Sequence, residues 1–261
     1  MKRKILKWTL RISTLLILFL ALLVVLVLNP TLLYANKTVI GKFTVYHNQQ
    51  LDENLKLRLN DADEILKSSE LYDANLKFDI CLNDGSIYPS LMEIFMGQAF
   101  ALGFTSNKIV ICGNENFKDN SVEVNNYKWN LTQLLAHEAT HCLVFHKNGF
   151  WNSNPVANHA KWKWEGYPEF VSRKNADQID LARSIVQLNL SMEKDKNEWG
   201  IYFTDSTISS REYFNYRLMV QYCIEIKKMT FEKILNDTTS EQTINSEMMS
   251  WFEKQKNNWQ E

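Results

Sequence analysis

The sequence of 261 residues has only four prolines and eight glycines, and it contains no repeat or low-complexity linker. Its four cysteines, Cys81, Cys112, Cys142 and Cys223, form no Cys-x-x-Cys pair, which argues against a cysteine-bound zinc site. No basic stripe runs along the chain, so a nucleic-acid partner is not expected. Length and composition therefore favour one globular domain with a sizeable core behind the N-terminal segment.

Acidic residues are absent from the first 36 positions, and charge of either sign is absent from residues 12–36. This stretch contains an unbroken apolar run of 14 residues, Leu15–Leu28, and five basic residues precede it: Lys2, Arg3, Lys4, Lys7 and Arg11. A membrane-spanning helix needs about 20 mostly apolar residues, and basic flanks stay in the cytoplasm. We expect a cytoplasmic tail at 1–11, a transmembrane signal-anchor at 12–36 and an extracytoplasmic domain at 37–261.

A cleaved signal peptide with a cut near Ala35 is the alternative, and it would release a secreted domain. The apolar core is long for a signal peptide, and Leu33 is not the small residue expected two positions before such a cut. We therefore favour a single-pass anchor in the cell membrane. All 30 acidic residues but only 24 of the 29 basic ones follow residue 36, so the exported part has a net charge of about −6.

The exported part divides into a mixed first half and a helical second half. Strands are expected at 41–48, in QAFALGF, in LKFDICL and in NKIVICG, and a helix is expected within 51–72. Beyond Asn126 the patterns are helical. This order indicates an α+β fold, with a small mixed or antiparallel sheet before the helices. Cys81 and Cys112 lie in two of the strands and could pair, but we favour burial of all four cysteines as small apolar side chains.

The first of these helices contains the segment WNLTQLLAHEATHCLVF, residues 129–145. Asn130 is a suitable N-cap, Gln133 completes a start similar to a capping box, and the helix is expected to end near Lys147. His137 and His141 lie one turn apart on one face of such a helix.

Glu138 borders the same face, so the two imidazoles can bind one metal ion while Glu138 reaches a water on it. The alternative is an ordinary helix with surface histidines. That alternative would leave the imidazoles and the carboxylate without partners on an apolar face, which is costly.

A third ligand is needed, because catalytic zinc usually keeps three protein ligands and a water. The segment KWKWEGYPEF contains Glu165, 24 residues after His141 and at the start of the next helix. Glu169 follows four residues later on the same face, where it can hydrogen-bond a metal-bound histidine. Gly166 is expected to let the backbone pass close to the metal-binding helix.

His-Glu-Ala-Thr-His followed by Trp-Glu-Gly-Tyr-Pro-Glu resembles the gluzincin metallopeptidases, the clan of the thermolysin-like peptidases and neutral aminopeptidases. The resemblance is close over residues 130–170. It implies a zincin-like domain in which His137, His141 and Glu165 bind one Zn²⁺ per chain and Glu169 supports a histidine ligand. It also implies that Glu138 takes a proton from water during attack on a peptide carbonyl and passes it to the leaving amine.

In relatives of this kind a Tyr or His from a later helix stabilises the developing oxyanion. The segment YFNYRLMVQY offers Tyr213, Tyr216 and Tyr222, of which we favour Tyr216; the alternative is that these tyrosines only pack the helix. Pro168 departs from the family pattern, where Ala is commoner. The Gly-x-Met-Glu-Asn signature of the aminopeptidases is absent, so no amino-terminal specificity is implied.

The sequence thus predicts a membrane-anchored zinc metallopeptidase that cleaves peptide or protein substrates outside the cytoplasm. The alternative is a non-catalytic, zinc-stabilised binding domain on the cell surface, in which a general base such as Glu138 would be unnecessary. A purely structural domain with an accidental motif is the third possibility. The strand in QAFALGF, if it lies at a sheet edge, is a candidate to pair with an extended peptide.

Overall fold

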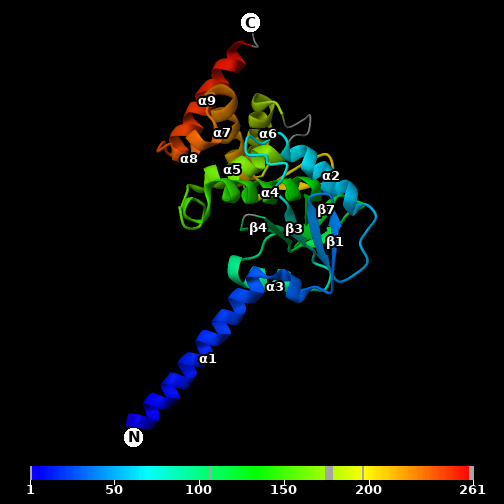
Figure 1. Ribbon diagram of the computed structural model, residues 1–261. Coiled ribbons are helices and arrows are strands. Elements are labelled where there is room, and N and C mark those ends of the chain that lie inside the picture. Colours follow the sequence, from blue (N-terminus) through cyan, green and yellow to red (C-terminus); the bar gives the residue numbers. More distant parts are fainter. Residues whose placement is uncertain (1, 106, 174–178, 196, 259–261) are drawn as a thin grey trace.

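The computed structural model describes residues 2–105, 107–173, 179–195 and 197–258, and it begins with a long helix, α1 (Lys2–Leu28), that projects from a folded domain (Figure 1). Residues Lys7–Leu28 of this helix are long and apolar enough to cross a membrane, and none of them is buried in the domain. A membrane anchor and a signal sequence both satisfy this description.

The helix ends at Leu28, eight residues before the end expected from the sequence. Pro30 disfavours helical backbone at Asn29, and a 3₁₀ turn, η1 (Pro30–Leu33), follows. The next residues belong to the domain, because the hydroxyl of Tyr34 donates to the carbonyl of Leu82 at 2.8 Å. The expected boundary at residue 36 is therefore wrong, and the domain begins near residue 30.

The main sheet has five strands in the order β1-β2-β3-β5-β4. Its strands are β1 (Asn36–Ile40), β2 (Phe43–His47), β3 (Phe78–Cys81), β4 (Ala101–Phe104) and β5 (Lys108–Ile111). The three central strands are parallel, whereas β1 and β4 are antiparallel edges. Parallel neighbours need long crossovers, and α2 (Leu55–Leu66) and α3 (Tyr88–Met96) lie in those connections.

Alternation along the strands sends side chains to opposite faces of this sheet. Val45, Ile80 and Ile109 belong to the main core. The residues that follow them in the strands, Tyr46, Cys81 and Val110, belong to a smaller cluster with Tyr88 and Met92 of α3. Helices α2 and α4 therefore cover one face and α3 the other, as Figure 1 shows. All four cysteines are buried and no disulfide is found among the described residues, as favoured from the sequence.

A second sheet of three antiparallel strands leads into the helix with the histidines. Its strands are β6 (Asn114–Asn116), β7 (Ser121–Val124) and β8 (Tyr127–Asn130), none of which was expected. Helix α4 (Leu131–Asn148) begins directly after β8, and the side chain of Asn130 accepts from the backbone N–H of Gln133 at 3.1 Å. The N-cap and the C-terminal Gly149 agree with the prediction. The side chain of Gln133, however, contacts Arg173 instead of completing the capping box.

The second half is largely helical, as expected. Its elements are η2 (Phe150–Asn152), α5 (Lys161–Ser172), α6 (Leu181–Lys194), β9 (Gly200–Tyr202), β10 (Ile208–Ser210), α7 (Arg211–Gln221), the π-helical turn η3 (Tyr222–Ile226), α8 (Phe231–Asn236) and α9 (Glu241–Asn258). The β9–β10 hairpin was not expected from the sequence. The protein is thus a mixed α+β fold with small sheets, in agreement with the predicted class.

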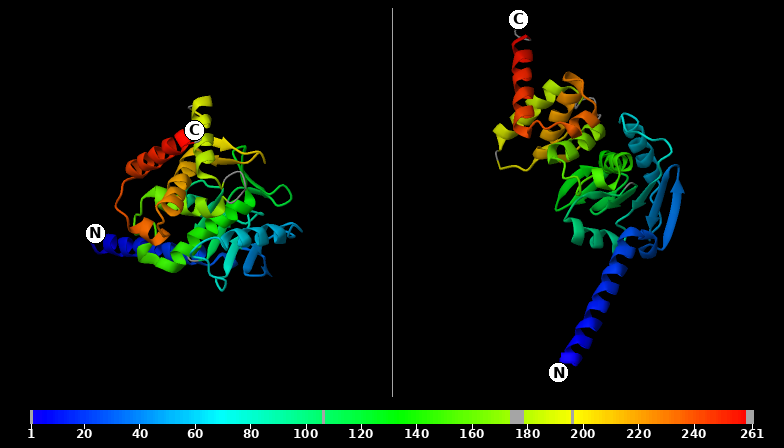
Figure 2. Two further views of the ribbon diagram at one scale, coloured as in Figure 1. Left: turned by 90° about the horizontal axis from the view of Figure 1, so that it is seen from above. Right: turned by 60° about the vertical axis from the view of Figure 1, so that its left-hand side comes forward.

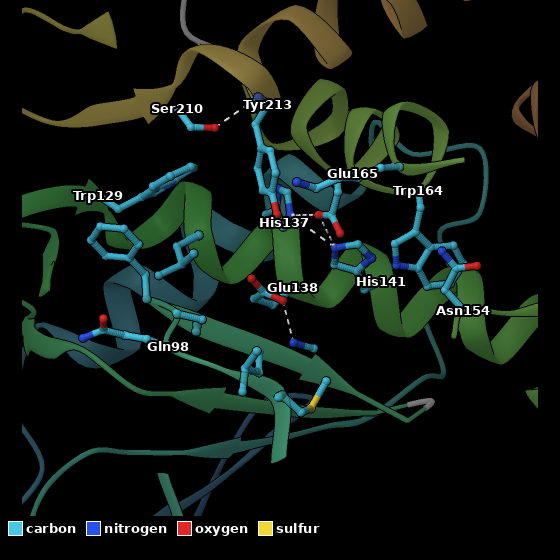
Figure 3. Close-up of a pocket in the computed structure, with 18 of the residues that line it drawn as sticks. Gln98, Trp129, His137, Glu138, His141, Asn154, Trp164, Glu165, Ser210 and Tyr213 are labelled. Carbon is cyan, nitrogen blue, oxygen red and sulfur yellow. Dashed lines mark hydrogen bonds and ion pairs between the residues drawn. The ribbon is translucent and has the colours of Figure 1, made fainter. Parts of the chain in front are cut away.

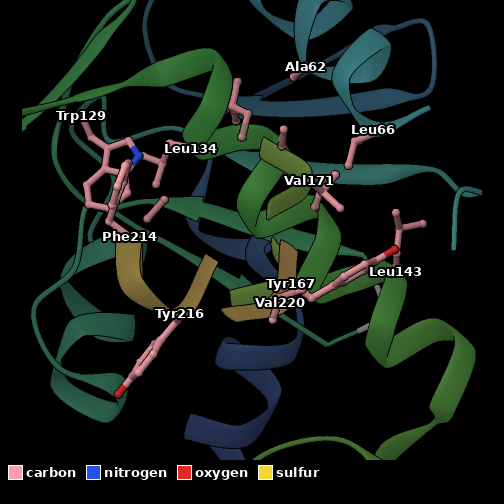
Figure 4. Close-up of a cluster of buried hydrophobic side chains, with 14 of the residues drawn as sticks. Ala62, Leu66, Trp129, Leu134, Leu143, Tyr167, Val171, Phe214, Tyr216 and Val220 are labelled. Atoms are coloured by element: carbon pink, nitrogen blue, oxygen red, sulfur yellow. The ribbon is translucent and has the colours of Figure 1, made fainter. Parts of the chain in front are cut away.

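Helix α4 lies between the main sheet and the second-half helices (Figure 2). Every residue from Leu131 to Val144 is buried. Apolar side chains of α2, α5 and α7 pack around it, including those of Leu66, Val171 and Phe214 (Figure 4). Because residues 131–144 are all buried, their polar side chains need partners inside the protein.

Candidate metal centre

Three side-chain atoms converge where α4 passes α5. The Nε2 atoms of His137 and His141 are 3.2 Å apart. Oε2 of Glu165 lies 3.2 Å from Nε2 of His141 and 3.5 Å from Nε2 of His137. All three side chains point toward one another in Figure 3. They form the one His-rich group among the described residues whose ligand atoms are close enough to bind a metal ion.

The spacing of these atoms fits a tetrahedral ion. Zinc binds His nitrogen and carboxylate oxygen at about 2.0–2.2 Å, and tetrahedral angles then separate neighbouring ligand atoms by about 3.4 Å. The three observed separations fall close to that value. Two imidazoles and one carboxylate are also a donor set that suits Zn²⁺. The residues present therefore fit a zinc ion in both chemistry and geometry.

Charge at the site also favours a cation. Burial lowers the pKa of His137, but Glu165 and Glu169 outweigh this effect and raise it to about 10. Burial raises the pKa of Glu165, but His141 and His137 outweigh it and lower the pKa below the usual range of a carboxyl. Within the described part of the chain, no lysine or arginine forms an ion pair with Glu138 or Glu165. A divalent cation would balance the negative charge of these two carboxylates.

Glu138 lies beside the three ligand atoms without joining them. Its Oε2 accepts from the backbone N–H of Gly103 in β4, so the carboxylate points to the strand side of the site (Figure 3). Burial is the largest effect on Glu138 and raises the pKa of its carboxyl, whereas the two histidines oppose the rise. A carboxylate at this position is near the ligand atoms yet remains available as a base.

Gly103 allows this close approach of β4 to α4. A Cβ atom at position 103 would lie 2.7 Å from the carbonyl oxygen of Glu138 and 3.0 Å from Cβ of His141. Gly166, which was expected to face the metal-binding helix, instead packs on α7, where an added Cβ would lie 2.6 Å from the carbonyl oxygen of Tyr216. The expectation for Gly166 was therefore wrong about the partner helix.

Glu169 is fully buried behind His137. Its Oε2 lies 3.1 Å from Nδ1 of His137, and its Oε1 accepts from Nε of Arg173 and from the hydroxyl of Ser209, each at 2.8 Å. A carboxylate at Nδ1 keeps the ring proton there and leaves Nε2 free to bind a metal. Glu169 therefore contacts the ring nitrogen of His137 that faces away from Glu165 and His141, and its support of a metal ligand stays a prediction.

Tyr213, not Tyr216, lies at the site. The Tyr213 ring is parallel to the His137 ring with centroids 6.1 Å apart, and it extends toward the ligand atoms in Figure 3. Burial, followed by Glu165 and Glu138, raises the pKa of its hydroxyl. Tyr216 does not line the cavity and its hydroxyl donates to Glu212 at 2.8 Å, so the earlier preference for Tyr216 was wrong.

The site opens into a cavity of about 1440 Å³. Strand β4, the end of α3, α4 and α5 contribute to its walls, together with aromatic residues such as Trp129 and Trp199. A largely apolar cavity with a few convergent polar groups is typical of a substrate site, and this one is larger than most small-molecule pockets.

Several residues of the site were not found from the sequence. Arg173 lies four residues after Glu169, and this ion-pair spacing on a helix is a signal that could have identified it. Ser209 and Gly103 are distant in sequence and follow no recognisable spacing. No known protein-family model matches the chain, and no curated protein sequence matches it.

Proposed function

We propose that this protein is a membrane-anchored zinc metallopeptidase of the gluzincin type that hydrolyses peptide bonds outside the cytoplasm. One Zn²⁺ would be held by His137, His141 and Glu165. The observation that carries the proposal is the convergence of these three ligand atoms at the spacing of a tetrahedral ion, with Glu138 beside them.

When bound, zinc would supply a Lewis acid that polarises a peptide carbonyl and acidifies water. Glu138 accepts the proton of the attacking water and returns it to the leaving nitrogen, as a general base and then a general acid. Its raised pKa favours this double role, because a carboxyl that is easily protonated also holds the proton until the amine leaves.

Tyr213 is the candidate donor to the developing charge on the carbonyl oxygen. Its raised pKa keeps the hydroxyl protonated, so it can donate a hydrogen bond at neutral pH. Its ring lies against His137, one of the ligands. Removal of such a donor typically lowers turnover by about 10²–10³.

The edge strand β4 is the candidate surface for the peptide backbone. It pairs with β5 on one side only, and three of its residues, Ala101, Leu102 and Gly103, line the cavity. An extended peptide can add to such an edge through main-chain hydrogen bonds. This arrangement would present the scissile carbonyl beside Glu138.

The contacts around the end of α1 support an uncleaved anchor. The hydroxyl of Tyr88 donates to the carbonyl of Val27, and the hydroxyl of Ser86 donates to that of Leu33. A cut near Ala35 would remove both partners together with the buried ring of Tyr34. With the basic residues before the apolar run, this favours an N-terminus in the cytoplasm and a catalytic domain outside.

Two variants test the function against the non-catalytic alternative. Glu138→Gln keeps the size of the side chain and removes its basicity, so zinc content should stay near that of the wild type while hydrolysis of a peptide library nearly disappears. Glu165→Ala removes a ligand, so zinc affinity itself should fall. Elemental analysis and turnover are measured on the same preparations.

Zinc binding without turnover in the wild type would favour the non-catalytic binding domain. Absence of zinc from the wild type after saturation and desalting would refute both functions. Loss of zinc from Glu138→Gln would show that Glu138 is a ligand and not the base.

A further inference from the structure

Helix α3 has an apolar face that the domain leaves uncovered. Tyr88 and Met92 are buried against the sheet, whereas Ile94 is 78% exposed and Phe95 is 55% exposed. Ile87, directly before the helix, is 67% exposed. Glu93 is the one charged residue in the helix. A group of large exposed apolar side chains such as this marks a surface that binds another protein, a ligand or a membrane.

The position of α3 next to the apolar helix α1 indicates that this partner is the membrane. The hydroxyl of Tyr88 donates to the carbonyl of Val27 at 2.7 Å, so α3 is attached to the last turn of α1 (Figure 1). The apolar part of α1, Lys7–Leu28, has 22 residues. At 1.5 Å per residue this is about 33 Å, close to the ~30 Å hydrocarbon thickness of a bilayer. Leu28 therefore reaches the edge of the hydrocarbon when Lys7 is at the other side.

We propose that α3 docks on the outer surface of the lipid bilayer, with Ile94 and Phe95 inserted beside the anchor. The apolar surface of α1 continues onto α3 at Leu28, so one lipid phase covers both. An exposed apolar face beside the end of a membrane-spanning helix can bury into the boundary between headgroups and acyl chains.

The docking has a consequence for the substrate, and this part rests on the proposed peptidase function. Leu28, Phe95 and Met96 line the same cavity as His137 and Glu138. The membrane end of the anchor and the candidate catalytic groups thus border one continuous space. We infer that the cavity admits polypeptides anchored in the same membrane and cleaves them in the segment close to the bilayer.

Docking is tested with the full-length protein in phosphatidylcholine vesicles. Because the four native cysteines are buried, a single introduced cysteine can be labelled selectively with an environment-sensitive fluorophore. Ile94→Cys is compared with Leu190→Cys, a matched control whose native side chain is 58% exposed on α6. Figure 1 shows helix α6 on the side of the domain away from α1.

The label at position 94 should show blue-shifted emission and lose intensity when spin-labelled lipids are included, whereas the label at position 190 should change in neither respect. Equal quenching at the two positions, or none at position 94, would overturn the docking.

The substrate class is tested with one peptide sequence presented in two forms, free in solution and tethered to the vesicle by a transmembrane helix. Wild-type protein should cleave the tethered form faster, and Ile94→Lys should lower the ratio of tethered to free cleavage. An unchanged ratio would overturn the inference about substrate. Failure of the wild type to cleave either form would refute the peptidase function, while the quenching result would still decide the docking.

Discussion

Glu169 offers the sharpest test of how the candidate metal centre is supported. Glu169→Gln keeps the volume of the side chain but leaves one oxygen for three donors. That oxygen should stay with Arg173 and Ser209, which turns the amide NH₂ toward Nδ1 of His137. The ring proton is then expected to move to Nε2, the atom that would bind zinc.

Loss of such a support typically lowers metal affinity about 10–100-fold, which corresponds to roughly 1.4–2.7 kcal/mol. Zinc at one hundred times the wild-type Kd stabilises the wild type by about 2.7 kcal/mol. At the same zinc concentration the Gln variant should gain only about 0.4–1.4 kcal/mol.

Glu169→Ala should mainly lower the free energy of unfolding. The ion pair between Glu169 and Arg173 is buried, with the side chains 0% and 1% exposed, respectively. Removing one partner of such a pair costs about 3–5 kcal/mol, because the other charge stays buried. For a domain of this size that cost lowers Tm by roughly 6 °C or more, even without zinc.

The assay is thermal unfolding of the full chain in detergent, with and without zinc, combined with zinc competition against a chromophoric chelator. Ser209→Ala is the matched control, since it removes a hydrogen bond to the Glu169 carboxylate and leaves His137 untouched; a hydrogen bond to a charged group is worth about 1.5–3 kcal/mol. Wild-type zinc affinity in Glu169→Gln would refute the proposed role of the contact. Complete loss of zinc at saturation would make Glu169 a ligand.

Three further predictions concern other parts of the molecule. Gly103→Ala should push β4 away from α4 because of the contact with Glu138, and we expect a lower Tm together with lower turnover; unchanged kinetics would mean that the strand adjusts freely. Tyr213→Phe should lower kcat by about 10²–10³, whereas Tyr216→Phe should change it little, and similar losses in both would contradict the assignment of Tyr213. A reporter fused after residue 261 should be active outside the cytoplasm while the chain stays full-length in the membrane fraction; cytoplasmic activity would exclude the proposed topology, and a shortened soluble product would favour cleavage.

The features that the sequence predicted are those set by local geometry. His137 and His141 share a face because a helix repeats every 3.6 residues, whatever surrounds it. The start of α4 at Asn130 and its end at Gly149 follow from the backbone groups that helix ends leave unpaired. The apolar helix at the N-terminus is equally local, since its length and composition are enough to identify it.

Tertiary packing decided the features that depend on distant segments. Tyr213 and Tyr216 lie on the same helix and look alike in sequence, and only the packing of α7 on α5 turns Tyr213 toward His137. Ser209 reaches Glu169 across 40 positions through a hairpin that the pattern did not reveal. The anchor was expected to reach residue 36 because Tyr34 and its neighbours are uncharged. The burial of Tyr34 against Leu82 and Tyr88 assigns this segment to the domain, since the same apolar side chain can be covered by lipid or by protein and only the fold determines which.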